Sequence, residues 1–153
     1  MNAMVNTLKA FFPAVIFAYV LASGLATQFN LAAIAALGME VPLADRAWAT
    51  FHDMVGMSSS YLILLLIAYT LSLPVAGWLS RKLSASRFLI FALAGFVALV
   101  ALHLLMKAAL GVSGIAATRT VLGLLSQGLA GALGGLAYVW LRNLDDPEPP
   151  VSG

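Results

Sequence analysis

Four long apolar runs constrain this chain more than any other feature. They cover residues 10–27, 60–79, 88–106 and 121–140. A helix needs roughly 20 mainly apolar residues to cross a hydrocarbon core of about 30 Å, and each run approaches or reaches that length. Within lipid, a single segment satisfies all of its backbone hydrogen-bonding groups only as a helix. The sequence therefore predicts an all-α integral membrane protein with a four-transmembrane-helix bundle.

The composition agrees with a membrane location and excludes several classes of site. Only 9% of the 153 residues are charged and 62% are hydrophobic, whereas a soluble domain carries roughly 25% charged residues. The net charge of +2 is small and the basic residues are scattered, so we expect no nucleic-acid partner. The absence of cysteine excludes disulfides and thiolate metal sites.

The connection between the first two runs, residues 28–59, is long enough to hold structure of its own. The apolar segment 31–37 is too short to span a membrane, and it either extends the first helix or forms a short interfacial or re-entrant piece. Farther along, Trp48, Phe51 and Val55 recur at helical spacing, with polar residues on another face. This pattern predicts a short amphipathic helix over residues 43–56, lying in the outer membrane interface.

Basic residues beside the spans predict the orientation. Arg81, Lys82 and Arg87 cluster around one short loop, the kind of loop to which the positive-inside rule gives most weight. We therefore expect both termini to be cytoplasmic, in a bacterial-type inner membrane. Residues 1–144 should form a single four-helix domain. The acidic, proline-rich tail 145–153 should be disordered.

The fourth span carries small residues at regular spacing. The glycines that form this face are Gly123, Gly128, Gly131 and Gly135. In membranes, small residues four apart allow a second helix to approach closely. The partner helix could belong to the same bundle, to a homo-oligomer or to a larger membrane complex. Alternatively, the smooth face around Gln127 leaves room for a ligand.

Two polar residues lie within the spans. Gln127 is about 12 Å deeper along the helix axis than Arg119, where an unpaired amide is costly. His103 precedes Lys107 by one helical turn, so both lie on one face. An ionisable residue inside a span is a functional-site hypothesis, although each of these two side chains could simply hydrogen-bond to a neighbouring helix.

The predicted topology places the candidate site residues on the outer side or in the outer half of the membrane. Ser58 to Ser60 and Tyr61 would line the mouth of such a site. The candidate ligand-binding residues are His52, Asp53, His103, Lys107, Arg119 and Gln127.

Several kinds of chemistry remain open for this set. Imidazole and thioether groups bind soft metals, and His52, Met54 and Met57 could act together with His103 and Met106. The two histidines could also ligate haem, and the outer acids and histidines could serve a membrane enzyme acting on lipid headgroups. The sequence leaves the metal and the cofactor unknown.

The functional expectation is a small polytopic, non-enzymatic membrane protein. It would bind or move a small or lipid-like ligand through an outward-facing site, or act as an accessory subunit of a membrane complex, with membrane lipids as partners. The alternative is a membrane enzyme, or a metal- or haem-binding protein, with its site at the outer face. No span contains a carboxylate, which argues against a proton-coupled carrier.

Overall fold

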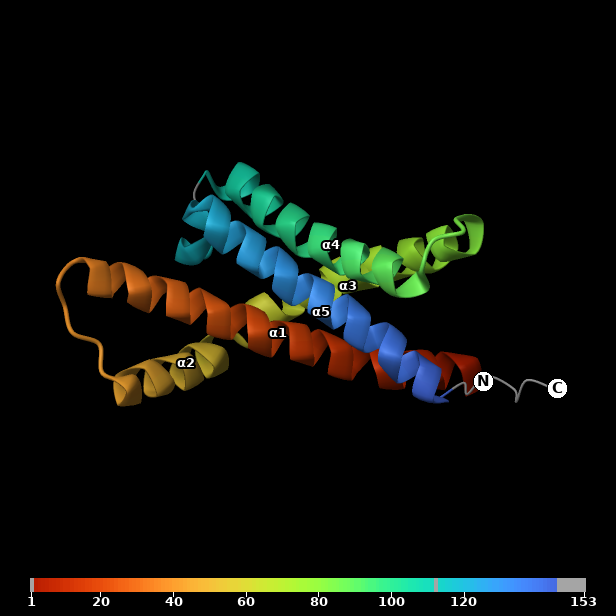
Figure 1. Ribbon diagram of the computed structural model, residues 1–153, viewed down its shortest axis with the longest axis horizontal. Coiled ribbons are helices and arrows are strands. Elements are labelled where there is room, and N and C mark those ends of the chain that lie inside the picture. Colours follow the sequence, from red (N-terminus) through yellow and green to blue (C-terminus); the bar gives the residue numbers. More distant parts are fainter. Residues whose placement is uncertain (1, 112, 146–153) are drawn as a thin grey trace.

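The computed structural model describes residues 2–111 and 113–145 (Figure 1). The predicted tail, apart from residue 145, lies outside the described residues. The described residues are all-α, as predicted, and contain no strand. The helices are, in chain order, α1 (Asn2–Ala36), α2 (Leu43–Met57), α3 (Tyr61–Lys82), α4 (Arg87–Leu110), the 3-10 helix η1 (Ala116–Arg119) and α5 (Val121–Asp145).

Four of these helices, α1, α3, α4 and α5, are long and apolar enough to cross a membrane. The chain is thus a multi-pass membrane protein, as the four apolar runs predict. The start of α1, the α3–α4 connection and the end of α5 lie at the same end of the bundle (Figure 1). We call this the termini end. The opposite end, where α2 lies, is the α2 end.

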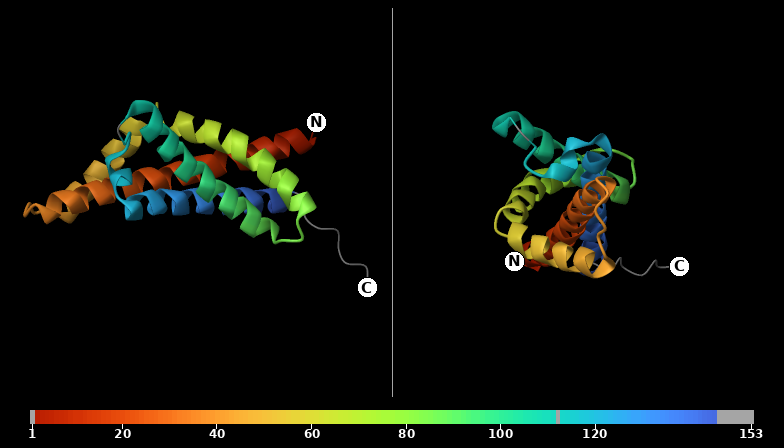
Figure 2. Two further views of the ribbon diagram at one scale, coloured as in Figure 1. Left: turned by 90° about the horizontal axis from the view of Figure 1, so that it is seen from above. Right: turned by 90° about the vertical axis from the view of Figure 1, so that its left-hand side faces the viewer.

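Helix α1 is much longer than the predicted span. It runs without interruption from Asn2 to Ala36. The apolar segment 31–37 therefore extends the first helix, which ends one residue before the segment does, and it is not re-entrant. Its 35 residues correspond to about 52 Å at 1.5 Å per residue. Seen from above, α1 and α2 extend together beyond α4 and α5 (Figure 2, left). Pro13 lies in the interior of the helix, not in its first turns as the shorter predicted span would place it.

The amphipathic helix α2 is confirmed and packs along the C-terminal half of α1. Its apolar residues Trp48, Phe51 and Val55 are exposed, with 68%, 61% and 59% of their surface accessible. Its polar residues Arg46 and Thr50 instead face α1 and bond to it. This arrangement is the reverse of that in a soluble protein, and it suits a helix whose apolar stripe meets lipid.

Glycines bring α4 and α5 into backbone contact. A Cβ atom on Gly131 would lie only 2.2 Å from the carbonyl oxygen of Gly95, and one on Gly135 would lie 2.1 Å from a carbonyl oxygen of α4. A Cβ atom on Gly128 would lie 2.6 Å from a ring of α4. These three glycines of the small face thus contact a helix of the same chain, at a distance that no larger residue permits.

The connection between α4 and α5 folds back against the bundle. Ile115 and Ala117 are buried, and η1 packs against α1 and α5. The fourth glycine of the predicted face, Gly123, contacts this connection: a Cβ atom there would lie 1.9 Å from Ala117 O. The residues of this segment form neither a long apolar run nor a helical stripe, so nothing in the sequence indicates that it packs against the bundle.

Candidate functional site

A buried network of polar contacts joins all four spanning helices near the α2 end. The Tyr61 hydroxyl of α3 donates to Gln127 Oε1 of α5 at 2.7 Å. Gln127 Nε2 in turn donates to the carbonyl oxygen of Ala22 in α1 at 3.0 Å. His103 Nε2 of α4 lies 3.4 Å from the Tyr61 oxygen, and its Nδ1 lies 2.7 Å from Leu99 O. Two of the six candidate site residues therefore meet at Tyr61.

The geometry assigns the protons within this network. Leu99 O can only accept, so His103 Nδ1 carries the hydrogen and Nε2 presents a lone pair in the neutral ring. The single Tyr61 proton goes to the nearer acceptor, Gln127 Oε1. The exposed fractions of Tyr61, His103 and Gln127 are only 3%, 4% and 0%. Because water does not reach these side chains, their polar atoms must find partners within the protein. Tyr61 is thus the centre of the network and not part of the mouth of a site.

His103 also lines a cavity of about 110 Å³ beside the network. Lys107 of α4 and Arg119 of η1 line the same cavity, together with Thr118 and Thr120. The Thr120 hydroxyl also accepts a hydrogen bond from Gly123 N at 3.1 Å and so caps the first turn of α5. Two cationic side chains and a helix N-terminus therefore border one space, a combination that attracts anions.

His52 and Asp53 do not reach this cavity. They lie on α2, and α1 runs between α2 and the α4–α5 connection in both Figure 1 and the right-hand view of Figure 2. His52 is exposed and its Nδ1 lies 4.0 Å from Asp53 Oδ1. The six candidate residues thus form two groups, one at the cavity and network and one on α2, and His52 and His103 contact different partners.

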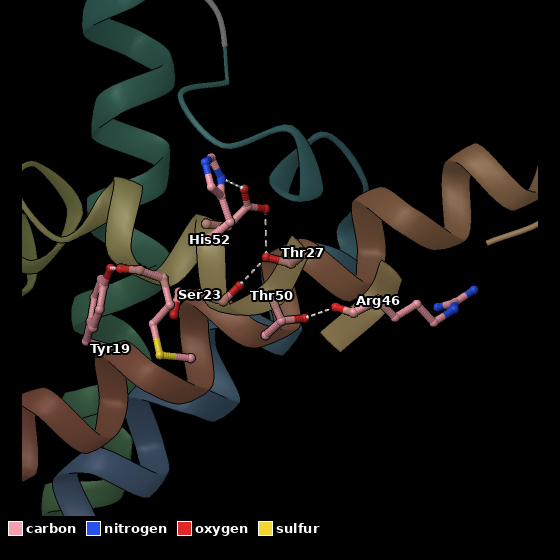
Figure 3. A network of polar contacts seen from close by, with 8 residues as sticks. Tyr19, Ser23, Thr27, Arg46, Thr50 and His52 are labelled. Carbon is pink, nitrogen blue, oxygen red and sulfur yellow. Dashed lines mark hydrogen bonds and ion pairs between the residues drawn. The ribbon is translucent and has the colours of Figure 1, made fainter. Parts of the chain in front are cut away.

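Asp53 belongs to a polar interface between α1 and α2 (Figure 3). Its Oδ2 lies 2.9 Å from the Thr27 hydroxyl, which also lies 3.1 Å from Ser23 O. The Tyr19 hydroxyl donates to Met54 O. This half of the interface is therefore held by hydroxyls of α1 that meet acceptors of α2.

The same interface continues toward the start of α2. Arg46 Nη1 donates to Gln28 Oε1 at 3.2 Å, and Gln28 Nε2 donates to the Thr50 hydroxyl at 2.9 Å. Thr50 donates in turn to Arg46 O at 2.7 Å. The polar stripe of α2 is therefore used to hold this helix to α1.

The described residues offer no cluster of three or more His, Asp or Glu side chains that could hold a metal ion. Both ring nitrogens of His103 already lie near partners within the bundle. His52 lies on α2 and His103 on α4, and His52 is not among the residues that line the cavity beside His103. The arrangement therefore provides an anion-attracting cavity and a polar network, with no assembled metal centre among the described residues.

Sequence reasoning missed the role of Tyr61. A tyrosine at the start of a span is typical of a membrane-interface anchor, and its position gives no sign that it bonds Gln127. Only the rotation of α3 about its axis reveals that contact. Comparison of the chain with protein-family models, with curated protein sequences and with solved structures finds no match.

Proposed function

We propose that this chain is a non-enzymatic multi-pass membrane protein that binds a small anion, or the anionic headgroup of a lipid, in the cavity at its α2 end. The observation that supports it best is the shared cavity of His103, Lys107 and Arg119. These basic groups come from α4 and η1, which follow one another in the chain, and the connection between them folds back so that all three line one space. Its volume of about 110 Å³ has room for several water molecules or one oxyanion.

The surrounding contacts favour binding over catalysis. His103 donates its Nδ1 hydrogen to Leu99 O, and its Nε2 faces the buried Tyr61 oxygen, so neither ring nitrogen is placed to exchange protons with a ligand. Lys107 and Arg119 remain exposed at the mouth, where they can neutralise a phosphate or carboxylate. Two cationic side chains, together with the apolar residues Leu104, Val121 and Leu124 in the lining, suit a ligand that is held without chemical change.

Inorganic phosphate provides a direct test with the purified full-length protein. A ligand at 100 times its Kd stabilises the folded state by about 2.7 kcal/mol, so phosphate should raise the unfolding temperature. Lys107→Gln and Arg119→Gln should each weaken this effect, whereas Lys9→Gln removes a charge at the termini end and should leave it unchanged. An equal response of all three variants and the wild type would contradict the proposal.

The proposal includes an orientation, with the α2 end outward and both termini cytoplasmic in a bacterial-type inner membrane. The basic loop around Arg81 supports it. Because the chain has no cysteine, single cysteines at Ser59 and Ser84, both exposed, give unique labels at the two ends. In intact cells an impermeant maleimide should label Ser59→Cys and spare Ser84→Cys. The reverse pattern would invert the orientation.

A further inference from the structure

A second and larger cavity lies at the termini end. Its volume is about 530 Å³, within the range of about 300–1,000 Å³ that is typical of ligand pockets. All four spanning helices contribute to its wall. The residues that matter for the argument are Phe11, Leu73, Arg81, Arg87, Phe91 and Arg142.

The cavity carries a concentrated positive charge. Arg81 lies in the last turn of α3 and Arg87 in the first turn of α4, and Arg142 lies in the last turn of α5. All three line the cavity, and none of its lining residues is acidic. The first turn of α4 adds the partial positive charge of a helix N-terminus, since Ser86 makes no side-chain cap there. The site therefore favours an anionic group.

Away from the arginines, the wall is apolar. Tyr69 and Arg81 both line the cavity and are 12 residues apart on α3, which corresponds to about 18 Å along the helix. Leu73 of α3 and Phe91 of α4, which also line the cavity, are both buried. The Tyr69 hydroxyl is already used, because it donates to Gly131 O at 2.7 Å. The deep part thus presents hydrocarbon and aromatic surface to its occupant.

Gly77 keeps the cavity open. It lines the wall, and a Cβ atom placed on it would meet only the edge of Phe91, at 3.9 Å. The glycines between α4 and α5 have no such space. A larger side chain at position 77 would therefore occupy the cavity without touching another backbone.

We propose that this cavity binds an anionic phospholipid, with the phosphate beside Arg81 and Arg87 and part of one acyl chain along Leu73 and Phe91. A charged rim over a deep apolar wall matches the two halves of such a lipid. Helix ends are also the depth at which headgroups lie. This site shares no residue with the α2-end cavity, so it goes beyond the function proposed above and does not depend on it.

Native mass spectrometry of the full chain in detergent tests the proposal with two lipids of matched acyl chains. Phosphatidylglycerol should bind the wild-type protein about tenfold more tightly than phosphatidylcholine. Hydrogen bonds to charged groups contribute about 1.5–3 kcal/mol, so the double variant Arg81→Gln/Arg87→Gln should lose at least about tenfold of that affinity. Equal binding of both lipids, or no loss in the double variant, would overturn the proposal.

The matched charge control is Lys82→Gln. Lys82 lies beside Arg81 at the same end, but its ammonium group sits 4.6 Å from the Trp78 ring and it does not line the cavity. Binding should stay within about twofold of wild type, since a screened surface charge contributes little. If Lys82→Gln lost as much phosphatidylglycerol affinity as the double arginine variant, the lipid would be attracted to the positively charged surface in general, and the proposed site would be overturned.

A second variant tests the cavity itself. Gly77→Leu fills the space, and it should fold because leucine favours a helix more than glycine does. This variant should abolish selective binding of phosphatidylglycerol. The control Gly56→Leu, on α2, should leave the selective binding unchanged. Unchanged selectivity in folded Gly77→Leu would overturn the proposal. Full competition by millimolar inorganic phosphate would do the same, because it would indicate a free-anion site. Lys107→Gln and Arg119→Gln should leave this selectivity intact, which separates failure here from failure at the α2 end.

Discussion

The two ends of the bundle use polar residues in opposite ways. At the α2 end, most polar side chains bond one another: Tyr61 meets Gln127, and Thr27 meets Asp53. At the termini end, three arginines line an open cavity of about 530 Å³. A polar group in a membrane protein faces either another helix or a space that holds water or ligand. We call the α2 end the closed end, because most of its polar side chains bond one another and leave only a small cavity of about 110 Å³, whereas the arginines of the termini end border a larger open space.

Substitutions of glycine should have the largest effects on the difference between the two ends. Gly131→Ala should destabilise the protein by about 1–3 kcal/mol or more, because the new Cβ atom would lie 2.2 Å from Gly95 O and backbone must move. Gly77→Ala has its nearest neighbour at 3.9 Å and should instead stabilise by about 0.5–1 kcal/mol. Denaturation by sodium dodecyl sulfate in mixed micelles measures both free energies of unfolding.

The outcome also identifies the partner of the glycine face. If Gly131→Ala left the free energy of unfolding unchanged and altered only the mass of the protein oligomer, the glycine face would form an oligomer interface and not the α4–α5 contact. A similar cost for Gly77→Ala would show that the termini end is closed in the membrane. Either result would remove the difference between the two regions.

The sequence predicts the spans well, because hydrophobic length alone determines which segments can cross a membrane. All four predicted runs coincide with helices long and apolar enough to cross, with only Ser60 lying outside them, and α2 differs by one residue from the predicted 43–56. The prediction underestimates α1 because the segment 31–37 continues its helix beyond the length that lipid requires. Length in excess of the bilayer leaves no signal in hydropathy.

The site is less predictable than the fold. Arg81 and Arg87 give an orientation signal in the sequence, but their joint role in a cavity depends on how α3 and α4 are rotated. In the same way, His103, Lys107 and Arg119 line one cavity, whereas His52 and Asp53 lie on α2 and do not line it. Pairings between helices depend on register and rotation, which a single sequence does not specify.

The Tyr61 network is the next test of the closed end. Tyr61→Phe leaves Gln127 Oε1 buried without its donor and should cost about 0.6–1.7 kcal/mol, from the average to the largest value found for hydrogen bonds between membrane helices. The double variant Tyr61→Phe/Gln127→Leu should cost less than the sum of its single variants. Strict additivity in the same denaturation experiment would mean that the two side chains do not act as a pair.

The smallest effect is expected at the attachment of α2. Thr27→Val keeps the shape of the side chain but removes the hydroxyl that meets Asp53 at 2.9 Å. Because Asp53 is 41% exposed and can regain water, the loss should be about 0.5–1 kcal/mol. It should appear as easier local opening of α2, since Arg46 to Gln28 and Tyr19 to Met54 still hold this helix.

Trypsin offers a specific measurement of that opening. Arg46 is the only Lys or Arg between Lys9 and Arg81, so cleavage there reports on α2 alone. When opening is fast relative to cleavage, the rate follows the open population, and Thr27→Val should raise it about two- to fivefold. His52→Gln is the control: its ring is 75% exposed and lies 4.0 Å from Asp53, so cleavage should not change. If His52→Gln accelerated cleavage as much as Thr27→Val, the exposed side of α2 would contribute to its attachment, and the closed end would not rest on the α1 interface alone.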